Sequence, residues 1–219
     1  MQRILSALQQ YWGYNAFRPL QQEAMASVLT GRDSVTILPT GGGKSLCFQA
    51  PAIAMEGMAV VVSPLIALMK DQVDALNACG VPAAYINSTI TNEQRYATDA
   101  AIREGRLKLV YVTPERLAKP AFIEYLRRFK IAFIAVDEAH CISMWGHDFR
   151  PEYRQLKELK ERFPGIALHA YTATATPQVR DDIVQELNLA TPDVHVGNFD
   201  RPNLIYRVPR RSDLPTQII

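Results

Sequence analysis

The chain alternates short apolar runs, rich in β-branched residues, with longer stretches in which apolar residues recur at helical spacing. The apolar runs predict strands at residues 34–38, 59–63, 83–86, 107–112, 131–136, 166–171 and 193–196. The helical spacing predicts helices at residues 21–29, 44–55, 65–79, 92–104, 121–129, 152–163 and 177–187. Strands that alternate with helices are typical of a parallel sheet covered by helices on both faces. We therefore expect an α/β fold with a mostly parallel sheet.

Composition narrows the setting without identifying a partner. The 219 residues, of which 48% are hydrophobic, can bury one sizeable core, so we expect one domain. The 24 basic residues against 22 acidic ones give a net charge of +2, so a nucleic-acid site must be a local patch. Three dispersed cysteines without a CxxC pair favour a reducing compartment and exclude a cysteine zinc site within the chain. No signal peptide or membrane span is evident, and we expect a soluble intracellular protein.

A glycine-rich segment follows the first predicted strand and precedes a predicted helix: Thr40, Gly41, Gly42, Gly43, Lys44 and Ser45. Glycines let backbone amides approach phosphate oxygens, and the start of a helix favours anions. We expect Lys44 to contact the β- and γ-phosphates and Ser45 to bind magnesium. Leu38 stands where the strict phosphate-loop pattern has its first glycine, and a plain glycine turn is the alternative.

Two carboxylates, Asp137 and Glu138, follow the buried run at residues 131–136. The carboxyl ends of parallel strands form the edge at which open α/β sheets bind ligands. We expect Asp137 to hold magnesium, directly or through water, and Glu138 to orient and deprotonate the hydrolytic water. The alternative is that Asp137 caps a helix and Glu138 is solvated. Together with Lys44, these carboxylates predict a site that hydrolyses ATP with Mg²⁺.

Several segments together resemble the first RecA-like lobe of RecQ-family DNA helicases, in family order from about Gly13 to Asn203. They are FRPLQ, LPTGGGKSLCFQAP, VVSPLIALMKDQV, YVTPERL, DEAHCISMWGHDFRPEY, YTATAT and NFDRPN. The combination of DEAHCIS with WGHDFRPEY distinguishes RecQ proteins from the general DEAD/DEAH-box RNA helicases. Met144 and Tyr171 depart from the common pattern, and neither removes a group that the ATP site needs.

The resemblance assigns adenine recognition to residues ahead of the phosphate loop, namely Tyr14, Arg18 and Gln21. An aromatic ring stacks on the base, and a glutamine amide can both donate to and accept from its edge. From the residues alone, these would be ordinary side chains at the start of a helix.

The resemblance also implies a DNA-facing side coupled to the ATP site. Trp145, His147, Phe149 and Arg150 fall in the family's aromatic-rich loop, which links single-strand binding to ATP hydrolysis; a helix packed into the core is the alternative. Ser63, Thr113 and Arg116 fall in motifs that contact the DNA backbone, although such sequences are also plain helix starts. His140, Thr172 and Thr174 would connect the carboxylates to the DNA side.

The function implied is that of the ATP-binding motor lobe of a RecQ-type helicase in DNA repair and recombination. The complete protein would move 3′ to 5′ on single-stranded DNA and unwind duplex DNA. The resemblance places this lobe at residues 1–203, including the adenine-recognition segment near residues 13–22. Residues 204–219 would form a linker to a second RecA-like lobe that supplies an arginine finger, so the lobe alone is expected to be weakly active or inactive. A noncatalytic nucleotide- and DNA-binding module and an RNA helicase lobe remain alternatives. The location would be cytoplasmic and nucleoid-associated in a bacterium, or nuclear in a eukaryote.

Overall fold

The structure is a computed structural model that describes residues 1–199. Its strands are β1 (Ser34–Ile37), β2 (Met58–Val62), β3 (Ala83–Ile86), β4 (Leu109–Val112), β5 (Ile131–Val136), β6 (Leu168–Thr172) and β7 (Asp193–Val196). Its α-helices are α1 (Gln2–Trp12), α2 (Gln21–Thr30), α3 (Leu46–Ala54), α4 (Ile66–Ala78), α5 (Asn92–Arg103), α6 (Pro114–Leu117), α7 (Pro120–Leu126), α8 (Leu159–Arg162) and α9 (Pro177–Glu186). Two 3₁₀ helices are η1 (Ala139–Ile142) and η2 (Pro151–Glu158). The predicted linker at residues 204–219 lies outside the described residues.

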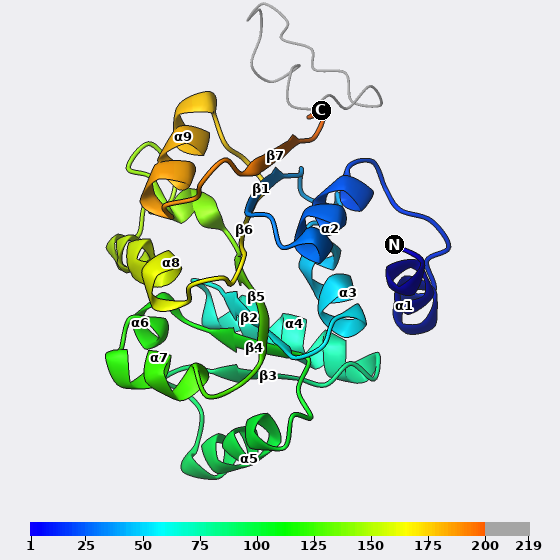
Figure 1. Cartoon of the computed structure of the whole chain (residues 1–219), viewed down its shortest axis with the longest axis vertical. Coiled ribbons are helices and arrows are strands. Elements are labelled where there is room, and N and C mark those ends of the chain that lie inside the picture. Colours follow the sequence, from blue (N-terminus) through cyan, green and yellow to red (C-terminus); the bar gives the residue numbers. More distant parts are fainter. Residues whose placement is uncertain (200–219) are drawn as a thin grey trace, which may run out of the picture.

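The strands form one parallel sheet in the order β3-β4-β2-β5-β6-β1-β7. Side chains alternate across it: Val60 and Val62 belong to the core on one face, whereas Ala59 and Val61 belong to the core on the other. Helices α2, α3 and α4 pack on the second face, and α5, α6, α7, α8 and α9 pack on the first (Figure 1). The predicted α/β fold is confirmed.

The register of the sheet brings distant segments together at its carboxyl edge. Ile37 of β1 lies opposite Thr172 of β6, and Val62 of β2 lies opposite Val136 of β5. The segments that leave these strands therefore emerge side by side, as is typical of ligand-binding edges in open α/β sheets. The glycine-rich segment follows β1 at this edge, and the two predicted catalytic carboxylates follow β5.

Every predicted strand is present, but two helical predictions need correction and one helix was not predicted. The helix predicted at residues 152–163 is largely the 3₁₀ helix η2, because Tyr153, Leu156 and Leu159 are buried at a spacing of three, which suits three residues per turn. The helix predicted from residue 44 begins at Leu46. Helix α1 was not predicted, although its buried Ile4, Ala7 and Leu8 follow helical spacing.

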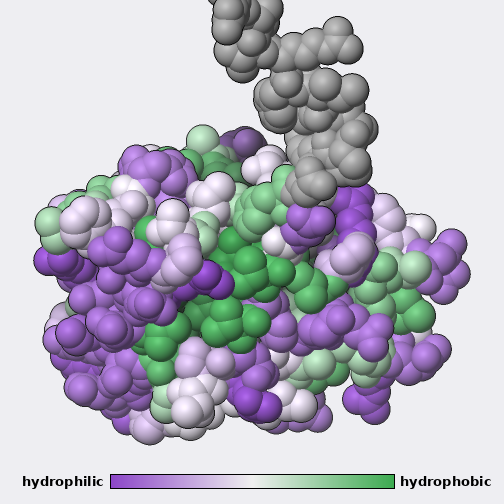
Figure 2. Space-filling view, turned by 90° about the horizontal axis from the view of Figure 1, so that it is seen from above, coloured by the Kyte–Doolittle hydropathy of each residue, from purple (hydrophilic) through white to green (hydrophobic). Residues whose placement is uncertain are grey.

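Strand β7 forms one edge of the sheet and presents apolar side chains to solvent. Val194 and Val196 are 49% and 43% exposed. Figure 2 views the molecule from the side of β7 and α9, and apolar residues gather there in a band bordered by hydrophilic ones. Among the described residues, no helix is long and apolar enough to span a membrane.

Candidate functional site

The loop between β1 and α3 has a backbone that only glycine adopts readily. Gly41 and Gly43 have φ angles of 81° and 78°, in the left-handed region. A Cβ atom at Gly43 would also overlap Nε2 of Gln21. The sequence of glycines thus fits both the turn itself and the close approach of helix α2 to it.

Two of the predicted adenine-recognition residues hold this loop in place. Nε2 of Gln21 donates to the carbonyl oxygen of Gly43 at 3.0 Å, and Oε1 accepts from the backbone N–H of Arg18 at 2.9 Å. Nη1 of Arg18 donates to the carbonyl oxygen of Gly41. Gln21 is buried, whereas Tyr14 is 46% exposed. Sequence reasoning missed this supporting contact, which links a neutral polar side chain to the backbone 22 positions away.

The lysine of the loop lies between the two carboxylates predicted for catalysis. Nζ of Lys44 is 2.7 Å from Oε1 of Glu138 and 3.1 Å from Oδ1 of Asp137. Burial lowers the pKa of Lys44, but the charges of Asp137 and Glu138 more than offset it and raise that pKa above its ordinary value. The ammonium is therefore charged at neutral pH.

A cavity of about 360 Å³ opens beside this triad. It is lined by Leu38, Pro39, Thr40, Gly41, Gly43, Lys44, Ser45, Leu46, Glu138 and Ala173. Ser45, half-buried, directly precedes α3. A backbone cradle with one cation suits phosphate oxygens, and hydroxyl and carboxylate oxygens suit magnesium. Within residues 1–199, no group of three or more His, Cys, Asp or Glu side chains is arranged for a metal, but Mg²⁺ usually needs only one or two carboxylates beside waters and phosphate.

Asp137 is fixed on several sides by its surroundings. Its side chain is almost fully buried, with Oδ1 accepting from the backbone N–H of Glu138 at 3.0 Å and Oδ2 accepting from Nε2 of Gln72 at 3.3 Å. The hydroxyl of Tyr153 donates to its backbone carbonyl at 2.8 Å. Gln72 in turn accepts from the buried hydroxyl of Tyr111 at 2.9 Å. Gln72 and Tyr153 are positioning residues that the sequence motifs contained but did not distinguish.

His140 connects the carboxylates to the loop that follows them. Its Nδ1 is 2.8 Å from Oγ1 of Thr172 and 3.3 Å from Oε2 of Glu138. Its ring stacks on that of His147, with centroids 4.1 Å apart. Burial, and then the charges of His147 and Lys44, lower the pKa of His140 to about 4, so the ring is neutral at pH 7. The hydroxyl of Thr172 in turn donates a hydrogen bond to the carbonyl oxygen of Thr174 at 3.0 Å.

The segment at residues 143–150 is a loop, consistent with Gly146 within it and Pro151 after it, and the alternative of a helix packed into the core is not observed. Trp145 is 69% exposed, whereas Phe149 is half-buried beneath the guanidinium of Arg154. Arg150 pairs with Asp148 at 3.0 Å. Gly146 approaches the DEAH segment so closely that a Cβ there would overlap the carbonyl oxygen of His140.

The three residues predicted to contact a DNA backbone differ in accessibility. Ser63 is fully buried, and its hydroxyl has no hydrogen-bond partner among the described residues. This burial argues against the predicted direct contact, because the hydroxyl does not reach the surface. Thr113 accepts from the backbone N–H of Arg116 at 3.3 Å and so caps α6. The guanidinium of Arg116 lies over the ring of Phe122, 5.0 Å from its centroid.

Comparison with known proteins decides the family. The model of the DEAD/DEAH box helicase family matches residues 18–183, which include the glycine-rich loop, both carboxylates and His140. The chain belongs to the DEAD/DEAH box helicase family.

Similar helicases include ATP-dependent DNA helicase RecQ from two bacteria. The protein of Pasteurella multocida (strain Pm70) is 49% identical over 94% of this chain and 32% of the relative. That of Bacillus subtilis (strain 168) is 48% identical over 95% of this chain and 36% of the relative. These relatives confirm the predicted resemblance to the RecQ family, and the chain spans about a third of their length.

Solved helicase structures share the fold at low sequence identity. Mycobacterium smegmatis helicase Lhr bound to ssDNA and AMP-PNP has a TM-score of 0.68 and 19% identity, covering 88% of this chain and 28% of that one. DUF1998 helicase MrfA bound to DNA and AMPPNP has a TM-score of 0.70 and 19% identity, covering 90% and 29%. The helicase lobe observed here is therefore of the RecA-like kind.

Proposed function

We propose that this chain is the ATP-binding motor lobe of a RecQ-type DNA helicase, which couples ATP hydrolysis to 3′-to-5′ movement on single-stranded DNA and to duplex unwinding. The observation that carries the proposal is the contact of Lys44 with both Asp137 and Glu138, beside a cavity that Lys44, Glu138 and the glycine loop line. Phosphate-binding and carboxylate groups of this kind are the parts that nucleotide hydrolysis needs.

Each residue of the site has a role that follows from its chemistry. The loop amides and Lys44 bind phosphate oxygens, and Ser45 and Asp137 provide oxygen ligands for Mg²⁺. Glu138, whose side chain is 22% exposed, orients a water and accepts its proton. Tyr14 stacks on adenine and Gln21 reads its edge with the hydrogen-bonding capacity that its loop contacts leave free. When bound, ATP and Mg²⁺ supply the bond to be cleaved and the charge that neutralises the phosphates.

The DNA side lies on the loop at residues 143–150 and beyond it. Exposed Trp145 offers a ring for base stacking, and Arg150 and Arg116 offer cations for phosphates. The stacked pair of His140 and His147 joins this loop to Glu138, so a shift of the loop on DNA changes the surroundings of the hydrolytic carboxylate.

The proposal predicts slow Mg²⁺-dependent ATP turnover that single-stranded DNA raises more than single-stranded RNA does. We expect Glu138→Gln to abolish turnover while ATP still binds, because the amide cannot accept the proton. Unchanged turnover in Glu138→Gln would contradict the assigned role. Stimulation by RNA that equals or exceeds stimulation by DNA would identify an RNA helicase lobe instead. Nucleotide and DNA binding without any turnover, even at high protein concentration, would favour a noncatalytic module.

A further inference from the structure

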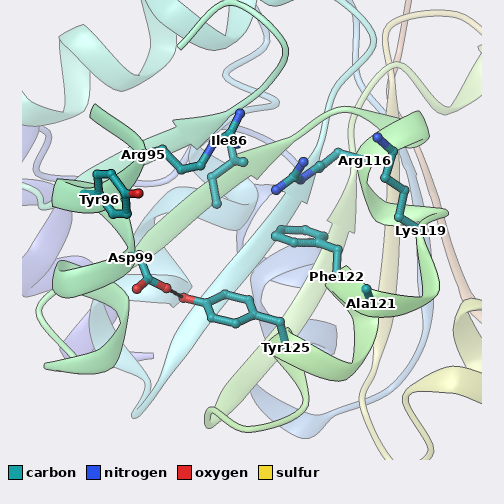
Figure 3. A pocket seen from close by; sticks show the side chains of 9 residues that line it. All are labelled: Ile86, Arg95, Tyr96, Asp99, Arg116, Lys119, Ala121, Phe122 and Tyr125. Atoms are coloured by element: carbon teal, nitrogen blue, oxygen red, sulfur yellow. Dashed lines mark hydrogen bonds between the residues drawn. The ribbon is translucent and has the colours of Figure 1, made fainter. Parts of the chain in front are cut away.

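A second cavity, of about 320 Å³, lies away from the ATP site at the carboxyl ends of β3 and β4 (Figure 3). It is lined by Ile86, Arg95, Tyr96, Asp99, Arg116, Lys119, Ala121, Phe122 and Tyr125, which come from β3, α5, α6, α7 and the turn between the last two. Its size falls within the range of about 300–1,000 Å³ typical of small-molecule sites. Sequence reasoning singled out only Arg116 from this set.

The cavity carries uncompensated positive charge. Arg95, Arg116 and Lys119 form no ion pair with any described residue, and Nε of Arg116 is buried without a hydrogen-bond partner. Burial, and then the charge of Arg95, lower the pKa of Arg116, as expected for cations that share a site without an anion. The single acid of the cavity, Asp99, already pairs with Arg103 at 2.8 Å and accepts from the hydroxyl of Tyr125. An anionic ligand would complete this set.

The floor and rim of the cavity are aromatic. Phe122 is nearly buried and stacks with Tyr125, with ring centroids 6.1 Å apart. Tyr96 lies at the rim and is 75% exposed, and its ring stacks on no other aromatic ring among the described residues. In Figure 3 the side chains of Arg95 and Arg116 extend toward the same opening above Phe122. A flat apolar group that carries an adjacent anion fits this combination, because aromatic rings stack on bases and cations bind phosphate.

We propose that this cavity binds one nucleotide of a DNA single strand, with its unstacked base against Tyr96 and its phosphate on Arg95, Arg116 and Lys119. The inference rests on the proposed DNA-binding function and adds a base pocket to the backbone contact predicted at Arg116. A strand is the occupant that fits the location, because α6 packs against η2, which directly follows the aromatic loop at residues 143–150. One strand can therefore run from that loop to the cavity along the same edge of the sheet.

The test is photocrosslinking of a short thymidylate strand carrying 5-iodouracil, with the crosslinked peptides identified by mass spectrometry. We expect crosslinks at Tyr96 in addition to those at Trp145. Crosslinks at the aromatic loop without any in the cavity would overturn the inference and leave the proposed function standing. The absence of both strand binding and crosslinks would overturn the inference together with the DNA-binding part of the proposed function.

Affinities measured by fluorescence anisotropy complete the test. Tyr96→Ala is expected to weaken binding of the strand at least about fivefold, because it removes the ring that stacks on the base. Tyr96→Phe keeps a ring and is expected to bind the strand as the unaltered chain does. Arg95→Ala is expected to lower the slope of log affinity against log salt by about 0.7, as for one lost phosphate contact on a single strand. The matched control is Arg106→Ala, which removes the same charge from an exposed site paired with Glu104 before β4. Equal effects of Arg95→Ala and Arg106→Ala, with no effect of Tyr96→Ala, would also overturn the inference.

Discussion

Replacement of Gly43 by alanine separates two constraints on the phosphate loop. The left-handed backbone at φ 78° penalises any residue with a Cβ by roughly 1–2 kcal/mol. The new Cβ would also displace the amide of Gln21 and break its 3.0 Å hydrogen bond to the Gly43 carbonyl, at roughly 0.5–1.5 kcal/mol. We expect Gly43→Ala to lower the free energy of unfolding by roughly 1.5–3.5 kcal/mol.

Gly41 provides the control, because its φ angle is 81° but a Cβ there would meet no atom within 4 Å. Gly41→Ala should therefore show the backbone penalty alone, roughly 1–2 kcal/mol, in urea unfolding without nucleotide. The gain from a less flexible unfolded chain is the same at both positions and cancels in the comparison. In a Gln21→Ala background, the excess penalty of Gly43→Ala should disappear. Equal losses for the two glycine variants, or strict additivity of Gly43→Ala with Gln21→Ala, would refute the packing described here.

Two further predictions concern buried polar groups, and a third concerns the close approach of Gly146 to the backbone of His140. Burial lowers the pKa of His169 to about 4 in the folded chain, whereas an exposed histidine in the unfolded chain titrates at about 6.5. Between these values the unfolded chain binds the extra proton, so the free energy of unfolding should decline as the pH falls from about 6.5 to about 4. The decline should be less steep in His169→Gln. A pH profile that is identical in His169→Gln would contradict this assignment. Tyr153→Phe leaves the Asp137 carbonyl without its donor and should cost roughly 1–3 kcal/mol in the same urea assay, whereas a neutral effect would show that the hydrogen bond is dispensable. Gly146→Ala would press on the carbonyl oxygen of His140 and should blunt stimulation of turnover by single-stranded DNA, with stimulation equal to that of the unaltered chain as the opposing result.

The strands and the catalytic motifs could be predicted because both are local in sequence. Fully buried parallel strands appear as apolar runs, as β5 does, and the glycine loop and DEAH tetrad each occupy consecutive positions. What could not be predicted depends on tertiary packing. The partners of Gln21, Gln72 and Tyr153 lie 22, 65 and 16 positions away, and a neutral polar side chain has no sequence signal that selects such a partner.

Local patterns misled where a motif says nothing about exposure or helix type. Ser63 directly follows β2 in a motif that resembles a DNA contact, yet it is completely buried. Helix η2 has amphipathic spacing that suits an α-helix nearly as well as a 3₁₀ helix, and this spacing does not show that the segment packs against α6, η1 and α9.

The most direct test of the ATP site is the binding of a fluorescent ATP analogue to the chain and to Lys44→Ala, with and without Mg²⁺. We expect saturable, Mg²⁺-dependent binding that weakens about tenfold or more in Lys44→Ala, because a charge-assisted hydrogen bond contributes roughly 1.5–3 kcal/mol. Thermal unfolding of both proteins would establish that the variant is folded. Equal affinity of the two folded proteins for the analogue, or an affinity that is the same with and without Mg²⁺, would contradict the assignment of Lys44, Ser45 and Asp137 to a nucleotide and magnesium site.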